Sequence, residues 1–187
     1  MKLIKKIFSN IHRYILWALL SALIWAFVFS IITDADRKKK VTVFFNTPSV
    51  EEYLFEEALD EDLPEGIRMV KVHGHEYTAF DSSVLNEIDI FILAEKDITE
   101  NLERFSPITG FEGYKLLEAD GVVYGVCVYD PSSGIACADE FVDYASPGGT
   151  EQIYYLCFLK DSPHIGEMNG SGDSAAVFVA KRILGMN

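Results

Sequence analysis

The feature that most constrains this chain is a run without a charged side chain at residues 14–32, YILWALLSALIWAFVFSII. At a rise of about 1.5 Å per residue, a helix over this run spans roughly 28 Å, close to the ~30 Å hydrocarbon core of a bilayer. Only a helix carries that much backbone through lipid with its amide groups bonded internally. The run therefore predicts a single-pass transmembrane helix.

A cleaved signal peptide is the alternative interpretation of the same run. Signal peptides have an apolar region of about 7–15 residues, followed by a cleavage site of small residues. The run is longer than that, and the residues that follow it, TDAD at 33–36, contain no A-x-A pattern. An uncleaved signal-anchor is therefore the prediction.

Basic residues flank the run on both sides in similar numbers, so the positive-inside rule alone does not decide the orientation. Lys2, Lys5, Lys6 and Arg13 precede the run, and RKKK at 37–40 follows it. The short N-terminal tail favours a cytoplasmic N-terminus, with the longer C-terminal part outside the cell membrane.

The chain divides into a cytoplasmic basic tail (1–13), a transmembrane anchor (14–33), a basic juxtamembrane collar (34–40) and an extracytoplasmic domain (41–187). The formal net charge is −13, and most acidic residues follow the collar. This negative field argues against nucleic acid as a partner and against anionic lipid surfaces. Hydrophobic residues make up 49% of the chain, so the domain can bury a core despite its charge.

Short apolar runs alternate with stretches of helical pattern between residues 41 and 102. Runs rich in β-branched and aromatic residues predict strands, and amphipathic stretches predict helices. Strands that alternate with helices predict an α/β domain, three-layer-like, with a largely parallel sheet and right-handed crossovers. The expected strands are 41–46, 67–72 and 88–93, and the expected helical segments are 47–59, 81–85 and 95–102.

The remaining residues give a mixed pattern. Residues 121–129 and 152–159 predict strands, residues 138–144 fit either a helix or an extended segment, and residues 174–184 predict a final helix. In the expected helix at 47–59, Leu54 is one of the residues that we expect to be buried.

The order of these elements resembles the first lobe of an extracytoplasmic solute-binding protein of the ABC-transporter type. The strand at 41–46 with the Thr47-Pro48 helix start resembles that family's first βα unit, and EIDIFIL at 87–93 resembles one of its strands. The loop FSPI at 105–108 and GVVYGV at 121–126 resemble the later loop and return strand. The chain also resembles single-pass membrane proteins of low-GC Gram-positive bacteria that carry such a lobe.

This resemblance implies a binding or accessory role, associated with an ABC-type transporter and with a permease or another membrane complex as partner. The chain departs from the family in two respects. The domain at 41–187 is too short for two lobes, so it cannot close around a small solute. No cysteine for lipid attachment lies near the end of the apolar run.

The three cysteines do not form a metal-binding pattern. Cys127 and Cys157 lie in apolar runs and are typical of small core residues. A bridge from Cys127 to Cys137 across the turn at 130–134 stays open as an alternative.

Paired carboxylates recur between residues 51 and 62. Glu51 with Glu52, Glu56 with Glu57, and the turn at 60–62 are predicted to form a solvated helix face and a polar turn.

Two histidines, His73 and His75, flank Gly74 at the end of an expected strand. Two imidazoles and a nearby carboxylate can hold a transition metal, and His164 could join them in space. This pattern gives the alternative hypothesis, a metal-dependent extracytoplasmic hydrolase that uses His73, His75 and His164. An exposed polar strand end explains the same residues without a metal.

Open α/β sheets bind ligands at the carboxyl ends of their parallel strands. That edge predicts Asn46, Thr47, His73, His75 and Glu95 as ligand-binding residues. The main hypothesis is a non-enzymatic, membrane-anchored, extracytoplasmic binding or accessory domain. It has no cofactor and no catalytic residue, and the sequence does not indicate its ligand.

Overall fold

The computed structural model describes residues 11–33, 35–74, 85–145 and 152–186. The chain forms two compact units, residues 1–36 and residues 37–187. The expected short helical segment at 81–85 lies mostly outside the described residues.

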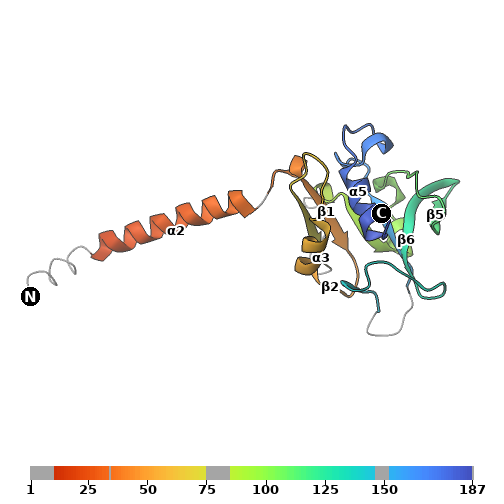
Figure 1. The fold of residues 1–187 in the computed structure, drawn as a ribbon, viewed down its shortest axis with the longest axis horizontal. Helices are drawn as coiled ribbons and strands as arrows, with labels where there is room; N and C mark the ends of the chain where they lie inside the picture. Colours follow the sequence, from red (N-terminus) through yellow and green to blue (C-terminus); the bar gives the residue numbers. More distant parts are fainter. Residues whose placement is uncertain (1–10, 34, 75–84, 146–151, 187) are drawn as a thin grey trace, which may run out of the picture. The chain divides into compact units, whose positions relative to one another are not determined.

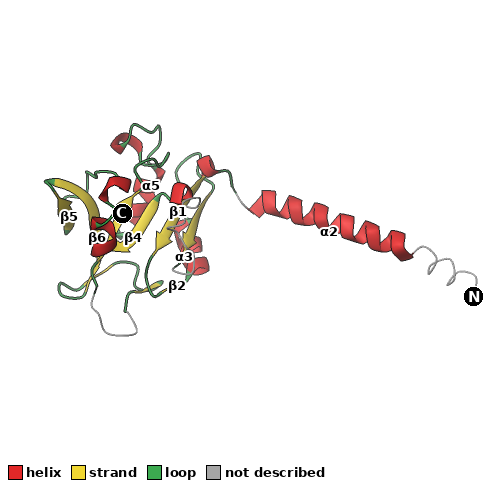
Figure 2. Ribbon diagram, turned by 180° about the vertical axis from the view of Figure 1, so that it is seen from behind, coloured by secondary structure: helices red, strands yellow, loops and turns green. Residues whose placement is uncertain are grey.

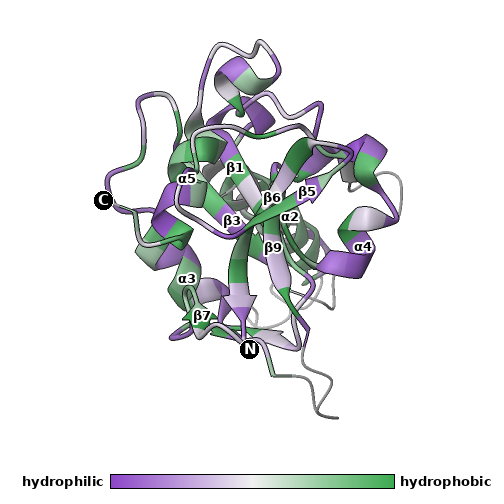
Figure 3. Cartoon of the chain, turned by 90° about the vertical axis from the view of Figure 1, so that its right-hand side faces the viewer, coloured by the Kyte–Doolittle hydropathy of each residue, from purple (hydrophilic) through white to green (hydrophobic). Residues whose placement is uncertain are grey.

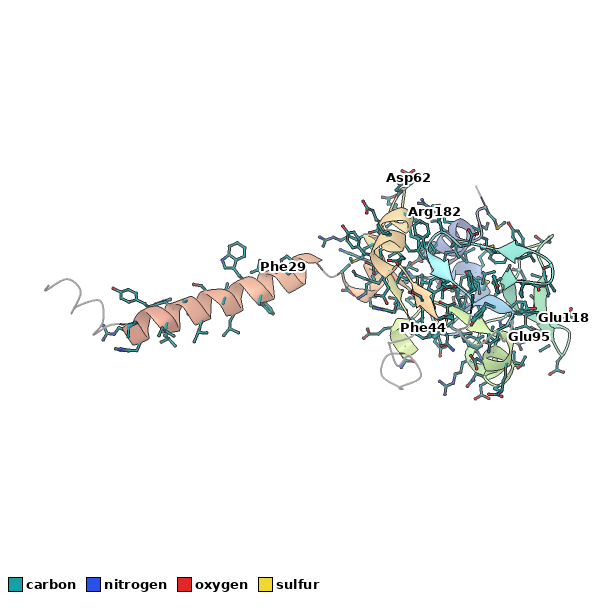
Figure 4. All side chains as sticks on the ribbon, turned by 90° about the horizontal axis from the view of Figure 1, so that it is seen from below. Phe29, Phe44, Asp62, Glu95, Glu118 and Arg182 are labelled. Atoms are coloured by element: carbon teal, nitrogen blue, oxygen red, sulfur yellow. The ribbon has the colours of Figure 1, made fainter. Side chains whose placement is uncertain are left out.

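The first unit contains one long helix, α2 (Ile11–Thr33). Its large apolar side chains, among them Phe29, project from the helix without being buried by the chain (Figure 4). Among the described helices, α2 is the one long and apolar enough to cross a membrane. Its length and composition fit a membrane anchor or a signal sequence.

The second unit is an α/β domain built on one mixed sheet of seven strands (Figures 1 and 2). The strand order is β3-β1-β4-β9-β6-β5, with β7 paired to β6. A separate two-stranded sheet joins β2 to β8. The strands are β1 (Lys40–Phe45), β2 (Ser49–Val50), β3 (Met69–His73), β4 (Ile90–Ala94), β5 (Leu116–Ala119), β6 (Val122–Asp130), β7 (Ile135–Ala136), β8 (Val142–Asp143) and β9 (Tyr154–Phe158).

The prediction of a largely parallel sheet is wrong. Among the described strands, the parallel pairs are β1 with β3 on one side and β1 with β4 on the other. The pairs β4–β9, β9–β6, β6–β5 and β6–β7 are antiparallel. One cause is the hairpin between β5 and β6, where Asp120 and Gly121 both have positive φ, 54° and 76°. Two such residues form the type of tight turn that joins antiparallel strands.

Helices cover both faces of the sheet, as Figure 3 shows with α3 and α5 on one side of the strands and α4 on the other. On the first face, Val43 and Ile92 pack in one cluster with residues of α3 and α5, such as Phe55 and Val179. On the second face, Phe91 and Cys157 pack with residues around α4. The helices are α3 (Glu52–Leu59), α4 (Glu95–Thr99) and α5 (Ala175–Ile183), with short 3₁₀ turns at Arg37–Lys39, Leu85–Glu87, Leu102–Arg104 and Gly166–Met168.

The first helix of the domain begins later than the sequence predicts. Ser49 and Val50 pair with β8, so α3 starts at Glu52 rather than near Thr47. The buried face of α3 consists of Phe55 and Leu59, and Leu54 is exposed. The expected burial of Leu54 is therefore wrong.

Candidate functional site: the carboxyl end of the parallel strands

The three parallel strands end at one edge of the sheet, with β1 between β3 and β4. Asn46 follows β1 directly, and its backbone N–H donates to the Ile92 carbonyl at 2.9 Å. The Asn46 side-chain amide donates to Asp97 Oδ2 of α4 at 3.0 Å. The residues that follow β1 and β4 are thus linked to each other by hydrogen bonds at this edge.

A hollow of about 440 Å³ lies beside the end of β1. One side comes from the segment after β1, through Ser49 and Glu51, and the other from the end of β6 and the chain that follows it. We call this region the open end. Its main lining residues are Ser49, Glu51, Tyr129, Asp139, Asp143 and Tyr144.

Aromatic rings form part of the wall of the open end. Tyr129 and Tyr144 stack with ring centroids 4.6 Å apart and planes 9° apart, and Tyr154 lies 5.5 Å from Tyr144. The Tyr144 hydroxyl donates to the Cys137 carbonyl at 2.9 Å. Burial raises the pKa of Tyr144 well above its ordinary value, so the hydroxyl remains a donor at neutral pH.

Carboxylates lie around these rings. Glu51, Asp139, Glu140 and Asp143 are all exposed and all line the hollow. Of these rings, Tyr129 is half-exposed, whereas Tyr144 and Tyr154 are buried. A half-exposed tyrosine beside several carboxylates suits a cationic group, because the ring and the carboxylates attract positive charge together.

The predicted ligand-binding residues are spread along this edge rather than gathered in the hollow. Thr47 is buried, 1% exposed, and its hydroxyl lies 3.4 Å from the Ser49 carbonyl. His73 ends β3 opposite Phe44, and Glu95 is exposed on α4. Of the predicted set, Asn46 and Thr47 lie nearest in the chain to the hollow. His75 lies outside the described residues.

The His73 side chain is half-buried at the end of the edge strand. Burial lowers its pKa below the ordinary value for histidine, and the nearby carboxylates of Glu52 and Glu56 offset part of this effect. His73 is therefore held more in its neutral form than a histidine in water.

A very different group of polar residues lies at the opposite edge, where β1 and β4 begin. We call this group the closed end: Arg37, Asp89, Ser162, His164 and Asp173. Asp89 is 0% exposed and comes directly before the apolar strand β4. Arg37 donates to both of its carboxylate oxygens at 2.7 and 2.6 Å, and the Ser162 hydroxyl donates to Oδ1 at 2.6 Å.

The Thr42 backbone N–H also donates to Asp89, at 2.8 Å. A buried carboxylate is tolerated when opposite charge and hydrogen bonds surround it, as they do here. Over the described residues, the one buried side-chain oxygen or nitrogen without a hydrogen-bond partner is Oγ1 of the same Thr42.

His164 belongs to the closed end and is 1% exposed. Its Nδ1 lies 3.0 Å from both Asp173 carboxylate oxygens, and its Nε2 lies 3.0 Å from the Arg37 carbonyl. His73 lies at the other end of β1, so the structure does not bring His73 and His164 together. Across the described residues, no group of three or more His, Cys, Asp or Glu side chains has an arrangement that fits a metal ion.

All three cysteines are free. Cys127 packs in the cluster around α4, whereas Cys137 packs against the cluster around α3 and α5. The two side chains face opposite sides of the sheet, so the bridge left open by the sequence does not form. Burial raises the pKa of Cys127 to about 11, which keeps this thiol protonated.

The sequence reasoning missed the main residues of the hollow. Residues 138–144, ADEFVDY, mix acidic and aromatic side chains between two apolar strands. This composition is the feature of the sequence that could have indicated a binding surface. What the segment does not reveal is that Val142 pairs with Val50, which brings β8 beside the end of β1.

No protein-family model, curated protein or solved structure matches the chain. The resemblance to a solute-binding lobe therefore stays a prediction that rests on the sequence.

Proposed function

We propose that this chain is a membrane-anchored, extracytoplasmic binding or accessory domain without catalytic activity, which holds a cationic segment of a partner protein at the open end. A permease or another membrane complex is the partner that we infer from the sequence resemblance. The observation that carries the proposal is the hollow beside the end of β1, with stacked tyrosines in its wall and exposed carboxylates around it.

The closed end supports a binding role rather than a catalytic one. The Ser162 hydroxyl is bonded to Asp89, not to the His164 ring. Both ring nitrogens of His164 face oxygen acceptors of the protein, and the side chain is buried. A general base must reach the proton that it removes from a substrate, and this ring is already engaged on both sides.

The membrane part of the proposal rests on α2, which is long and apolar enough for an anchor. An uncleaved helix would keep the domain at the membrane surface, because Arg37 is already bonded to Asp89 only a few residues after the helix ends. A partner in the same membrane would then meet the domain without a search through the bulk solution.

Site-specific photo-cross-linking in native membranes tests the proposal. A photo-reactive phenylalanine analogue replaces Asp143 at the open end, or Glu118 as a matched control. Both are exposed acids, but Glu118 pairs with Val123 near the start of β6, whereas Tyr129 lies near its end. We expect an adduct with a partner protein from position 143 and none from position 118.

Two further readouts sharpen this experiment. A Glu51→Lys and Asp143→Lys double variant, with the cross-linker at Ser49, should lose the adduct because it reverses the local charge. Labelling of Glu118→Cys in intact cells by a membrane-impermeant maleimide, in a Cys137→Ala background, should place the domain outside. Equal adducts at positions 143 and 118 would contradict the binding site, and labelling only after lysis would contradict the orientation.

A further inference from the structure

Strand β3 forms one edge of the seven-stranded sheet, with β1 on its inner side. The backbone N–H groups of Val70, Val72 and Gly74 point to the outer side, because each donates to an acceptor outside the sheet. An edge with a free row of such donors readily pairs with a strand of another molecule.

On this edge, each of the three donors meets a carboxylate from α3 or the residue that caps it. Val70 N–H donates to Asp60 Oδ1 at 2.6 Å, and Val72 N–H donates to Glu56 Oε1 at 2.9 Å. Gly74 N–H donates to Glu52 Oε1 at 2.6 Å. Glu52 and Asp60 are exposed, as a solvated helix face predicts, but the sequence does not indicate that these acids also bond to the β3 edge.

The three carboxylates match the three N–H donors because the helix and the strand place them at similar intervals. Glu52, Glu56 and Asp60 are spaced four residues apart, which is about 6.0 Å along a helix axis. The three donors are spaced two residues apart on a strand, which is about 6.6 Å. The two repeats agree closely enough for three successive carboxylates to follow three successive donors.

One ion pair and one glycine favour this arrangement of the carboxylates. Lys71, on the same strand, forms a 3.2 Å ion pair with Glu56 Oε2. A Cβ atom at Gly74 would lie 2.9 Å from Val50 Cγ1 and 3.1 Å from Glu52 Oε1. The glycine therefore provides the space in which Glu52 reaches the backbone.

We propose that Glu52, Glu56 and Asp60 act as a guard that keeps the β3 edge from pairing with β3 of a second copy of this chain. A carboxylate accepts hydrogen bonds but donates none, so the guard bonds to the outward N–H groups of β3 and not to its outward carbonyl groups. A neighbouring strand would bond to both kinds of group. Without the guard, the edge is a strand-addition surface.

A second copy fits this surface by symmetry. Val70, Val72 and Gly74 are evenly spaced about Val72, so two antiparallel copies related by a two-fold axis near Val72 present matching positions to each other. The pairing would make a continuous sheet across two protomers, and it requires no other sequence than that of β3.

The test compares two triple variants of the full chain in detergent. E52A/E56A/D60A removes the guard, and E51A/E57A/E61A removes three neighbouring exposed acids with the same change in charge. In sedimentation equilibrium, we expect at least about tenfold tighter self-association for the first variant than for wild type and the control. In the E52A/E56A/D60A variant, amide exchange at Val70, Val72 and Gly74 should slow as the protein concentration rises.

Adding Val72→Pro to the first variant identifies the surface that pairs. Proline removes the outward N–H of residue 72 and should return the variant to the sedimentation of wild type. Because Val72 is 1% exposed, Val72→Ala in the same variant is the control: it also loses buried packing but keeps the N–H, and it should still dimerise. Dimers that persist with Val72→Pro would overturn the proposal, as would an unguarded variant that sediments like wild type. If the triple alanine variant does not fold, Glu52→Ala alone removes the acceptor of the Gly74 N–H and gives the same two readouts.

Discussion

The two ends of the parallel strands carry polar residues in opposite states. At the closed end, Asp89 is fully buried and receives hydrogen bonds from Arg37, Thr42 and Ser162. At the open end, the acids Glu51, Asp139 and Asp143 are exposed around a hollow with an aromatic wall. The same residue types therefore bond within the fold at one end and remain exposed to solvent at the other.

This difference predicts which acidic residues affect folding stability and which affect binding. A buried carboxylate that is fully bonded contributes through the donors that it satisfies, and its loss leaves them buried without acceptors. An exposed carboxylate contributes little to folding but much to the surface field that a cationic partner meets. Substitutions at the two ends should therefore separate stability from binding.

The largest expected effect is from Asp89→Ala at the closed end. The change leaves the Arg37 guanidinium, the Thr42 N–H and the Ser162 hydroxyl without their acceptor. We expect the free energy of unfolding to fall by about 3–5 kcal/mol, measured by urea denaturation. Asp139→Ala at the open end is the control, with an expected change within about 0.5 kcal/mol. Similar losses in both variants would remove the distinction between the two ends.

A smaller effect is expected from Tyr144→Phe, which changes one atom in the wall of the open end. The Tyr144 side chain is 5% exposed, and without its hydroxyl the Cys137 carbonyl loses a donor. We expect a loss of about 1 kcal/mol in the free energy of unfolding. Tyr53→Phe is the matched control, because Tyr53 is 76% exposed and its hydroxyl should not affect folding. A loss no larger than that of the control would show that the wall does not depend on this bond.

The smallest effect is the pH dependence that His73 contributes at the end of β3. Burial lowers the pKa of His73, so the unfolded chain binds the proton more readily than the folded chain does. The stability from neutral His73 is present above the ordinary histidine pKa of about 6.5 and is lost as the pH falls through that value toward the lower folded pKa. Urea midpoints between about pH 7.5 and pH 5 should fall less steeply for His73→Gln than for wild type. Equal slopes would contradict this assignment.

Part of the fold is readable from local pattern. The uncharged run at 14–32 predicts a helix, and α2 covers it. The apolar runs at 41–46 and 88–93 become β1 and β4, and the end of the chain forms α5 within the expected range. In each case, the residues that decide the element are contiguous, so composition and periodicity suffice.

Other features depend on partners far away in the chain. The prediction of a largely parallel sheet fails because β9 pairs antiparallel with β4, and β6 pairs antiparallel with β9. Leu54 is exposed because α3 packs on the sheet through the face that carries Phe55 and Leu59. The acids Glu52, Glu56 and Asp60 bond to the β3 edge, although their sequence looks like a solvated helix face.

The sequence by itself determined where the apolar helix lies, which runs become buried strands, and that the domain is acidic and of α/β type. Tertiary structure alone decided the direction of half the sheet, the position of the hollow beside β1, and which carboxylates are buried. The reason is physical: a side chain's neighbours along the chain set its local conformation, but the energy of a charge depends on the donors and the water around it. Those surroundings, such as Arg37 and Ser162 around Asp89, exist only once distant segments have packed together.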